Sequence, residues 1–170
     1  MATAHINIGS NLGDRAAIIR HAVAAVEKAL GSSARIASPV ESEAWGYESP
    51  NRFLNVGIAV ETALDPVEIM HRLASVEKSI DSSSHRTASG GYADRALDID
   101  LIAVGAQTVA SEDLTLPHPR MHLREFVLLP VAELEPQWRH PVLGMTACEL
   151  LRLLQSDSSA MASMASPSRQ

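Results

Sequence analysis

Residues 95–105 read RALDIDLIAVG, an apolar run that two aspartates interrupt. Its leucine, isoleucine and valine content and its closing glycine predict a strand within or beside a core. Alternate side chains of a strand share a face, so Asp98 and Asp100 should project from one side, about 7 Å apart. Two carboxylates this close repel each other and lose hydration unless a cation lies near them. The pair therefore marks either an exposed edge strand without a function or a cation site.

The composition limits the class of protein. The chain has 170 residues, of which 46% are hydrophobic and 20% charged, with a formal net charge of −6. These values predict a globular protein with one domain over residues 1–154, and they argue against a nucleic-acid or membrane partner. The single Cys148 and the lack of a long apolar run indicate a cytoplasmic protein. The small, polar residues 155–170 are expected to form a disordered tail.

Hydrophobic spacing and turn residues predict the order of the elements. Strands are expected near residues 4–10, 34–40, 53–62 and 95–105, and helices over 14–31 and 65–80. A short strand near Thr108 and helices over 121–134 and from Thr146 should follow. The order predicts an α+β fold, a ferredoxin-like β-α-β-β-α-β sandwich with a helical C-terminal extension.

Cationic and imidazole groups follow the paired aspartates in the sequence. Arg95 begins the strand, and PHPRMHLREF at residues 117–126 adds two histidines and two arginines. Carboxylates beside such groups suit a magnesium-phosphate site, because Mg²⁺ takes oxygen ligands from carboxylates, phosphates and water. The only lysines, Lys28 and Lys78, do not follow glycine, and no G-x-G-x-x-G occurs. Arginine, histidine and metal should therefore hold a nucleotide's phosphates.

Four further motifs occur in order: INIGSNLGDR at 6–15, FLN at 53–55, DRALDIDL at 94–101 and LTLPHPRMHLREFVLLPVAEL at 114–134. Together they resemble the 6-hydroxymethyl-7,8-dihydropterin pyrophosphokinase family over about residues 6–141. The resemblance implies an α+β enzyme that moves diphosphate from ATP to a pterin hydroxymethyl group and releases AMP, in folate biosynthesis. It implies small-molecule substrates and a monomer.

The resemblance also implies roles for individual residues. Asp98 and Asp100 would be the ligands of two Mg²⁺ ions and, with Arg86 and Arg95, the catalytic group. The positions that match ATP contacts are Glu77, Arg86, Tyr92, Arg95, Leu101, His118 and Arg124. Those that match pterin contacts are Ser42, Glu43, Trp45, Phe53, Asn55 and Phe126. Without the motifs, several have an ordinary alternative: Arg95 could pair with Asp94 or Asp98, Glu77 with Lys78, and either phenylalanine could be a core residue.

The chain departs from the family pattern in two segments. SIDSSSHRTA at 79–88 leaves Arg86 where better-known members carry two arginines, and Tyr92 stands where tryptophan is common. SEAWGYESPN at 42–51 replaces a Thr-Pro-Pro type segment beside the pterin. Two alternative functions stay open: another Mg-dependent phosphoryl transferase on the same fold, and a non-enzymatic nucleotide or pterin sensor.

Overall fold

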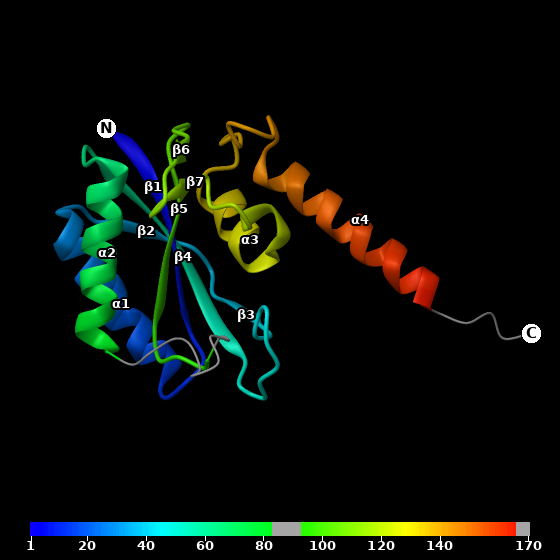
Figure 1. Ribbon diagram of the computed structural model, residues 1–170, viewed down its shortest axis with the longest axis horizontal. Helices are drawn as coiled ribbons and strands as arrows, with labels where there is room; N and C mark the ends of the chain where they lie inside the picture. Colours follow the sequence, from blue (N-terminus) through cyan, green and yellow to red (C-terminus); the bar gives the residue numbers. More distant parts are fainter. Residues whose placement is uncertain (83–92, 166–170) are drawn as a thin grey trace, which may run out of the picture.

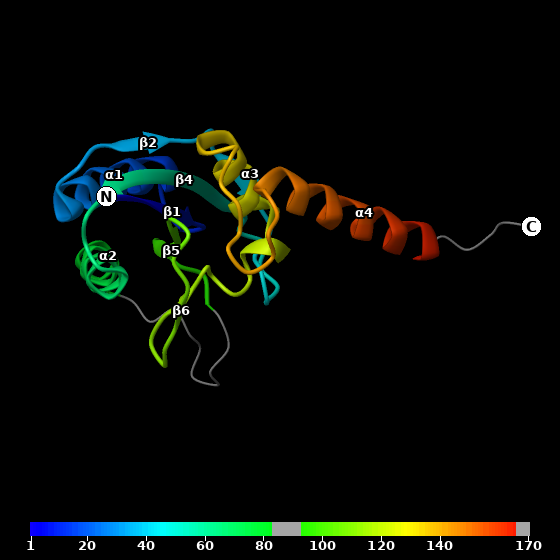
Figure 2. The same ribbon diagram turned by 90° about the horizontal axis from the view of Figure 1, so that it is seen from above.

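The computed structural model describes residues 1–82 and 93–165, which form an antiparallel sheet with helices on both faces (Figure 1). The spatial strand order is β2 (Ala34–Ile36), β4 (Phe53–Thr62), β1 (Ala2–Ser10) and β5 (Asp98–Val104), and β3 (Val40–Ser42) also pairs with β4. Helices α1 (Arg15–Leu30) and α2 (Pro66–Ile80) lie on one side of the sheet, and α3 (Glu125–Leu134) lies on the other (Figure 2). The expected α+β class is confirmed.

Local sequence signals set the ends of the first two helices. The Asp14 carboxylate accepts a hydrogen bond from the Ala17 N–H at the start of α1, and Gly31 ends that helix at a φ of 73°. Asp65 caps α2 in the same way by accepting from the Val67 N–H, and Pro66 occupies the first helical position. An acidic cap supplies an acceptor to an orphan N–H, and glycine adopts the left-handed terminus without strain.

Strand alternation divides the sheet into two chemically different faces. Ala4, Ile6 and Ile8 of β1 join the core beneath α1 and α2, together with Ile58 and Val60 of β4. The intervening residues of β1 face the other way, toward α3, and include His5 and Asn7. The apolar face stabilises the fold by packing. The polar face can carry side chains that bind ligands.

Helix α3 rests directly on β4 at a glycine. A Cβ atom added to Gly57 would lie 2.1 Å from the Pro130 Cβ, so only glycine allows this approach. Pro130 stands inside α3 and Val127, Leu128 and Val131 are also buried on that helix. The contact fixes the height of α3 above the sheet.

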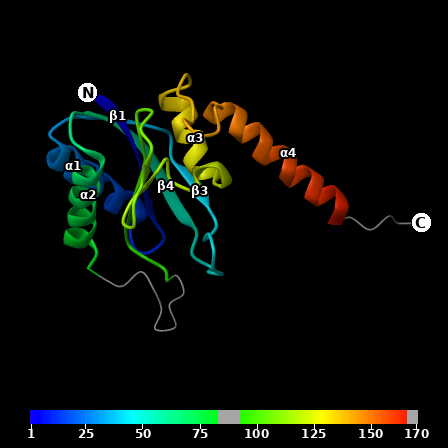
Figure 3. The same ribbon diagram turned by 45° about the horizontal axis from the view of Figure 1, so that its top comes forward.

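The C-terminal part adds a second, smaller core. The two-stranded ribbon of β6 (Val109–Ala110) and β7 (Thr115–Leu116) precedes the 3-10 turn η1 (Met121–Leu123). Met121, Leu128, Trp138 and Leu150 pack together with Ile102 of β5. Helix α4 (Ala147–Ala165) contributes its first turns to this core and then extends away from the body (Figure 3).

Three expectations about elements need correction. Residues 155–165 belong to α4 rather than to a disordered tail, since the stretch contains no proline or glycine to end the helix; residues 166–170 of the expected tail lie outside the described residues. The expected strand 34–40 is split into β2 and β3, because the Ser38 N–H donates to the Glu133 carboxylate instead of a strand. The expected helix 121–134 is η1 followed by α3, with Arg124 between them.

Among the described residues, no helix combines the length and the apolar character needed to cross a membrane. The prediction of a single domain over residues 1–154 stays a prediction.

Gly57→Ala should destabilise the protein by about 1–3 kcal/mol, because the new methyl group overlaps Pro130 and α3 must move. The measurement is urea unfolding followed by circular dichroism. Gly31→Ala is the matched control: a Cβ there meets nothing within 4 Å, so it tests only the cost of a positive φ. A Gly57→Ala variant as stable as the unaltered protein would contradict the close packing of α3 on β4.

Candidate active site

A pocket opens on the α3 side of the sheet, between the ends of β1, β4 and β5. Its lining consists of Asn7, Ser42, Glu43, Trp45, Phe53, Asn55, Arg95, Asp98, Asp100, His118, Arg120, Arg124 and Phe126. All six pterin-side candidates and both aspartates are in this set. Asn7 and Arg120 also line the pocket; both lie within the quoted motifs, but neither was given a role there.

The register of the sheet brings the two aspartates to the pocket. Asp98 lies opposite Gly9 and Asp100 opposite Asn7 on β1, so both carboxylates project from the same face, as the alternation predicts. Arg95 lies close by, with its Nη1 atom 3.5 Å from the Asp98 Oδ1 atom. The ion pair considered as a non-functional alternative therefore exists, and it lies inside the pocket.

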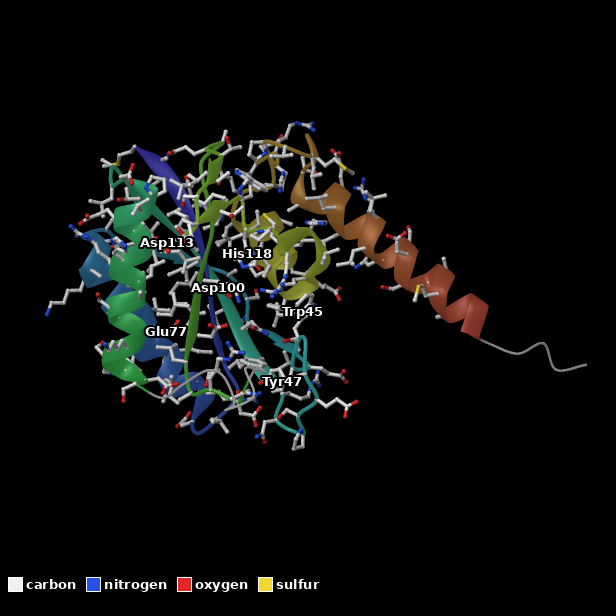
Figure 4. The ribbon with its side chains drawn as sticks, in the orientation of Figure 1. Trp45, Tyr47, Glu77, Asp100, Asp113 and His118 are labelled. Carbon is white, nitrogen blue, oxygen red and sulfur yellow. The ribbon has the colours of Figure 1, made fainter. Side chains whose placement is uncertain are left out.

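Two of the ATP-side candidates, Glu77 and Leu101, do not line the pocket. From α2 (Figure 4), the Glu77 Oε2 atom accepts a 2.7 Å hydrogen bond from the Ile99 N–H. Asp81, just beyond α2, likewise accepts from the Ala96 and Leu97 N–H groups. The Leu101 side chain is buried in the core on the opposite face. Arg86 and Tyr92 lie outside the described residues.

Aromatic rings and arginines form the pocket walls. The Arg95 guanidinium carbon lies 5.7 Å from the Phe53 ring centre, and that of Arg124 lies 4.4 Å from Trp45 and 5.8 Å from Phe126. Figure 4 shows Trp45 in the loop after β3, apart from Asp100 on β5 and His118 beyond β7. Flat rings next to guanidinium groups suit a planar heterocycle beside phosphates.

Asn55 is a buried amide with a fixed orientation. Its Nδ2 atom donates to the Val40 carbonyl at 3.1 Å and to the Ser42 Oγ atom at 2.8 Å. Its Oδ1 atom lies over Gly9, where an added Cβ would come within 3.1 Å. Glycine at position 9 therefore leaves room for a rigid amide on the pocket floor.

One carboxylate ties three chain segments together beside the pocket. The Asp94 Oδ1 atom accepts from Asn11 Nδ2 at 2.8 Å and from the Tyr47 hydroxyl at 3.0 Å, while Oδ2 accepts from Asn51 Nδ2 at 2.7 Å. Burial opposes ionisation of Asp94, but hydrogen bonds, including those from Ser49, Asn51 and Asn11, outweigh it and lower the pKa. This network was not foreseen, because its members are far apart in the sequence.

His118 is held as a neutral hydrogen-bond donor. Its Nδ1 atom accepts from the Arg120 N–H at 3.1 Å, which leaves the proton on Nε2. Burial, followed by the charges of Arg124 and Arg120, lowers the pKa of His118 to about 4. At neutral pH this ring can donate to a phosphate without adding a charge.

The donor set of the pocket fits magnesium. Within residues 1–82 and 93–165, no three histidine, cysteine, aspartate or glutamate side chains are grouped so as to hold a metal. Asp98 and Asp100 supply oxygen ligands only, and the Asp98 side chain is 29% exposed, so further positions remain for water and phosphate. Mg²⁺ binds in this way, through one or two carboxylates, phosphate oxygens and water.

Sequence comparisons match the chain to known proteins over most of its length. The family model for 7,8-dihydro-6-hydroxymethylpterin-pyrophosphokinase matches residues 5–136. The chain is 35% identical over 142 residues to a 2-amino-4-hydroxy-6-hydroxymethyldihydropteridine pyrophosphokinase of Porphyromonas gingivalis, covering 83% of this chain and 95% of the relative. A protein of the same name from Aquifex aeolicus is 33% identical, with 84% and 86% coverage.

Structural comparison supports the fold alone, because the sequence identities are low. A crystal structure of an HPPK-DHPS in complex with substrates gives a TM-score of 0.69 at 12% identity, covering 94% of this chain and 44% of that chain. The Plasmodium falciparum wild-type HPPK-DHPS gives 0.62 at 14% identity, with 96% and 46% coverage. The chain thus spans less than half the length of these two proteins.

The low pKa of His118 makes stability depend on pH. The unfolded chain binds a proton at this residue near pH 6.5, whereas the folded protein does not until about pH 4. The contribution of His118 to the free energy of unfolding is therefore complete above pH 6.5 and is lost as the pH falls toward 4.

His118→Gln should therefore flatten the acid side of the stability curve, measured by urea unfolding at intervals between pH 7 and 4. Exposed His21→Gln controls for the loss of an ordinary histidine. Equal slopes for His118→Gln and the unaltered protein would show that His118 titrates normally.

Proposed function

The chain belongs to the 7,8-dihydro-6-hydroxymethylpterin-pyrophosphokinase family, and we propose that the pocket described above is where it transfers diphosphate from ATP to the pterin hydroxymethyl group, as a step of folate biosynthesis. The observation that carries the assignment of the site is the convergence of two motifs on one cavity. Phe53 and Asn55 come from FLN, while Asp98 and Asp100 come from DRALDIDL on a different strand.

The pterin occupies the part of the pocket near β4. Phe53 and Phe126 both line it, and two aromatic rings can hold a flat heterocycle between them. Asn55 lines the same space, and because its Nδ2 atom already donates to Val40 and Ser42, its carbonyl is the group that would accept a hydrogen bond from an N–H at the edge of the ring. Ser42 holds the Asn55 amide in place, and Glu43 and Trp45 form the adjoining wall.

ATP occupies the other part, beside β5 and the residues after β7. Arg95 and Arg124 supply guanidinium groups for phosphate oxygens, and His118 donates from Nε2. Glu77, Leu101, Arg86 and Tyr92 remain predicted nucleotide contacts that rest on the resemblance. The Glu77 carboxylate already accepts from the Ile99 backbone, so it also orients the strand that carries the aspartates.

Asp98 and Asp100 would hold two Mg²⁺ ions, whose positive charge would offset that of the ATP phosphates. The residues of the pocket then act mainly by positioning: the rings and Asn55 fix the pterin with its hydroxyl oxygen in line with the β-phosphorus. The hydroxyl oxygen forms a bond to that phosphorus, the bond from the β-phosphorus to the oxygen of AMP breaks, and the hydroxyl proton is released. Arg95 and Arg124 stabilise the charge that develops on the phosphates.

The proposal also includes two finer features of the protein, which are the topology of the sheet and the number of chains in the active unit. The order β5-β1-β4-β2, with α1 and α2 on one face, supports the ferredoxin-like interpretation of the sheet. A monomer as the active unit remains a prediction that rests on the resemblance.

The direct test is an assay with ATP, Mg²⁺ and 6-hydroxymethyl-7,8-dihydropterin that separates the products by chromatography. AMP and the pterin diphosphate should appear in equal amounts. Release of ADP would instead indicate another phosphoryl transferase, and binding of both ligands without any product would indicate a sensor.

Asp98→Asn and Asp100→Asn should each lower kcat/KM at least about 1000-fold, because loss of one carboxylate removes several kcal/mol of transition-state stabilisation. The circular dichroism spectrum should not change. Exposed Asp157→Asn on α4 is the matched control and should keep full activity. Near-normal turnover by either pocket variant would contradict the metal assignment.

A further inference from the structure

Asn7 is a buried amide of the pocket that no motif explains. It lies in the middle of β1, is only 5% exposed and lines the pocket. Its Oδ1 atom is shielded from solvent and has no hydrogen-bond partner in the structure. A buried acceptor without a partner destabilises a folded protein, so a functional reason for keeping it is expected.

The position of Asn7 on the sheet limits what it can contact. On β5 it lies directly opposite Asp100, one of the two proposed metal ligands. On β4 it lies opposite Gly57, two residues along the strand from Asn55, on the same face. Side chains directly across a sheet are about 5 Å apart at Cβ, and diagonal ones about 7–8 Å. Asn7 therefore lies between the amide that reads the pterin edge and the carboxylate that holds the metal.

The reacting hydroxymethyl group has to lie in this interval. One end of the pterin is held at Asn55, and its hydroxyl must reach phosphates bound at Asp98 and Asp100. Above Gly57 the space is filled by Pro130 of α3, which closes the pocket floor on that side of Asn7. Resting on the proposed function, we propose that the Asn7 side-chain carbonyl accepts a hydrogen bond from the substrate hydroxyl and thereby positions it.

This contact has a chemical use before transfer. A hydroxyl has one O–H donor and two acceptor lone pairs. When its hydrogen points to Asn7, a lone pair of the same oxygen is free to face the β-phosphorus. Asn7 is thus a substrate-positioning residue, and its own buried carbonyl gains the partner that it lacks in the free protein.

The surroundings of Asn7 allow a substitution that removes its carbonyl group and keeps the packing. Behind it, toward α3, the lining of a small void includes Val127, Pro130 and Val131, all apolar. A leucine has nearly the shape of asparagine and would suit these neighbours. Asn7→Leu should therefore raise the thermal midpoint of the free protein by a few degrees, since it removes an unsatisfied acceptor.

The decisive measurement is the binding of two pterins by calorimetry, in the presence of Mg²⁺ and α,β-methylene-ATP, which prevents transfer. The unaltered protein should bind 6-hydroxymethyl-7,8-dihydropterin about 3- to 10-fold more tightly than 6-methyl-7,8-dihydropterin. This difference in affinity is the one expected from a single neutral hydrogen bond. Asn7→Leu should bind the two pterins equally, with its affinity for the ATP analogue unchanged. Thr3→Val, on the same strand and outside the pocket, should keep the preference.

Three results would overturn the inference. Asn7→Leu could keep the full preference for the hydroxymethyl compound, could weaken both pterins equally, or could lower the thermal midpoint, which would mark a structural role. Should Asn7→Leu fail to fold, Asn7→Ala tests the same preference. If the unaltered protein binds neither pterin, the proposed function fails as well, whereas a retained preference in the variant removes only the role of Asn7.

Discussion

The pairing of β1 with β4 on one side and β5 on the other is the constraint on which the site depends. This register places Asn55 beside Gly9, Asp98 across from Gly9 and Asp100 across from Asn7. A shift of one residue in either pair would turn the polar side chains into the core beneath α1 and α2. The apolar alternation of β1 therefore sets the geometry of the polar face, because burial of Ile6 and Ile8 permits one register only.

The edge strand β5 needs a second support, which α2 provides. Within the part of the chain that the structure describes, no strand pairs with its outer edge, and the Glu77 and Asp81 carboxylates accept from Ile99 and from Ala96 and Leu97. These bonds hold the segment that carries Asp98 at a fixed height above β1. Acidic side chains at the end of α2 and just beyond it thus take the place of a strand, which protects the edge from pairing with other chains.

Much of the fold was predictable from sequence because its signals are local. The acidic caps of α1 and α2, the alternation in β1 and β4 and the same-face aspartates all follow from short-range spacing. The break between β2 and β3 was missed because it depends on Glu133, which lies 95 residues from Ser38. The Asp94 network and the role of Asp81 were missed for the same reason. Asn7 was missed because an isolated polar residue in a strand does not reveal, by itself, whether it has a partner.

The paired strands β1 and β5 are far apart in the sequence, and this affects how the protein folds. Ala4 pairs with Val104, so the central strand is completed only after most of the chain has been made. Contacts between distant segments form slowly, since a large loop must close first. The pocket is lined by residues of β1, β4 and β5, so the proposed nucleotide and pterin sites are complete only when all three strands have paired. A ligand that binds only the folded chain stabilises it by an amount that rises with the logarithm of the ligand concentration, so the proposed substrates would add to the resistance of the chain to unfolding and proteolysis.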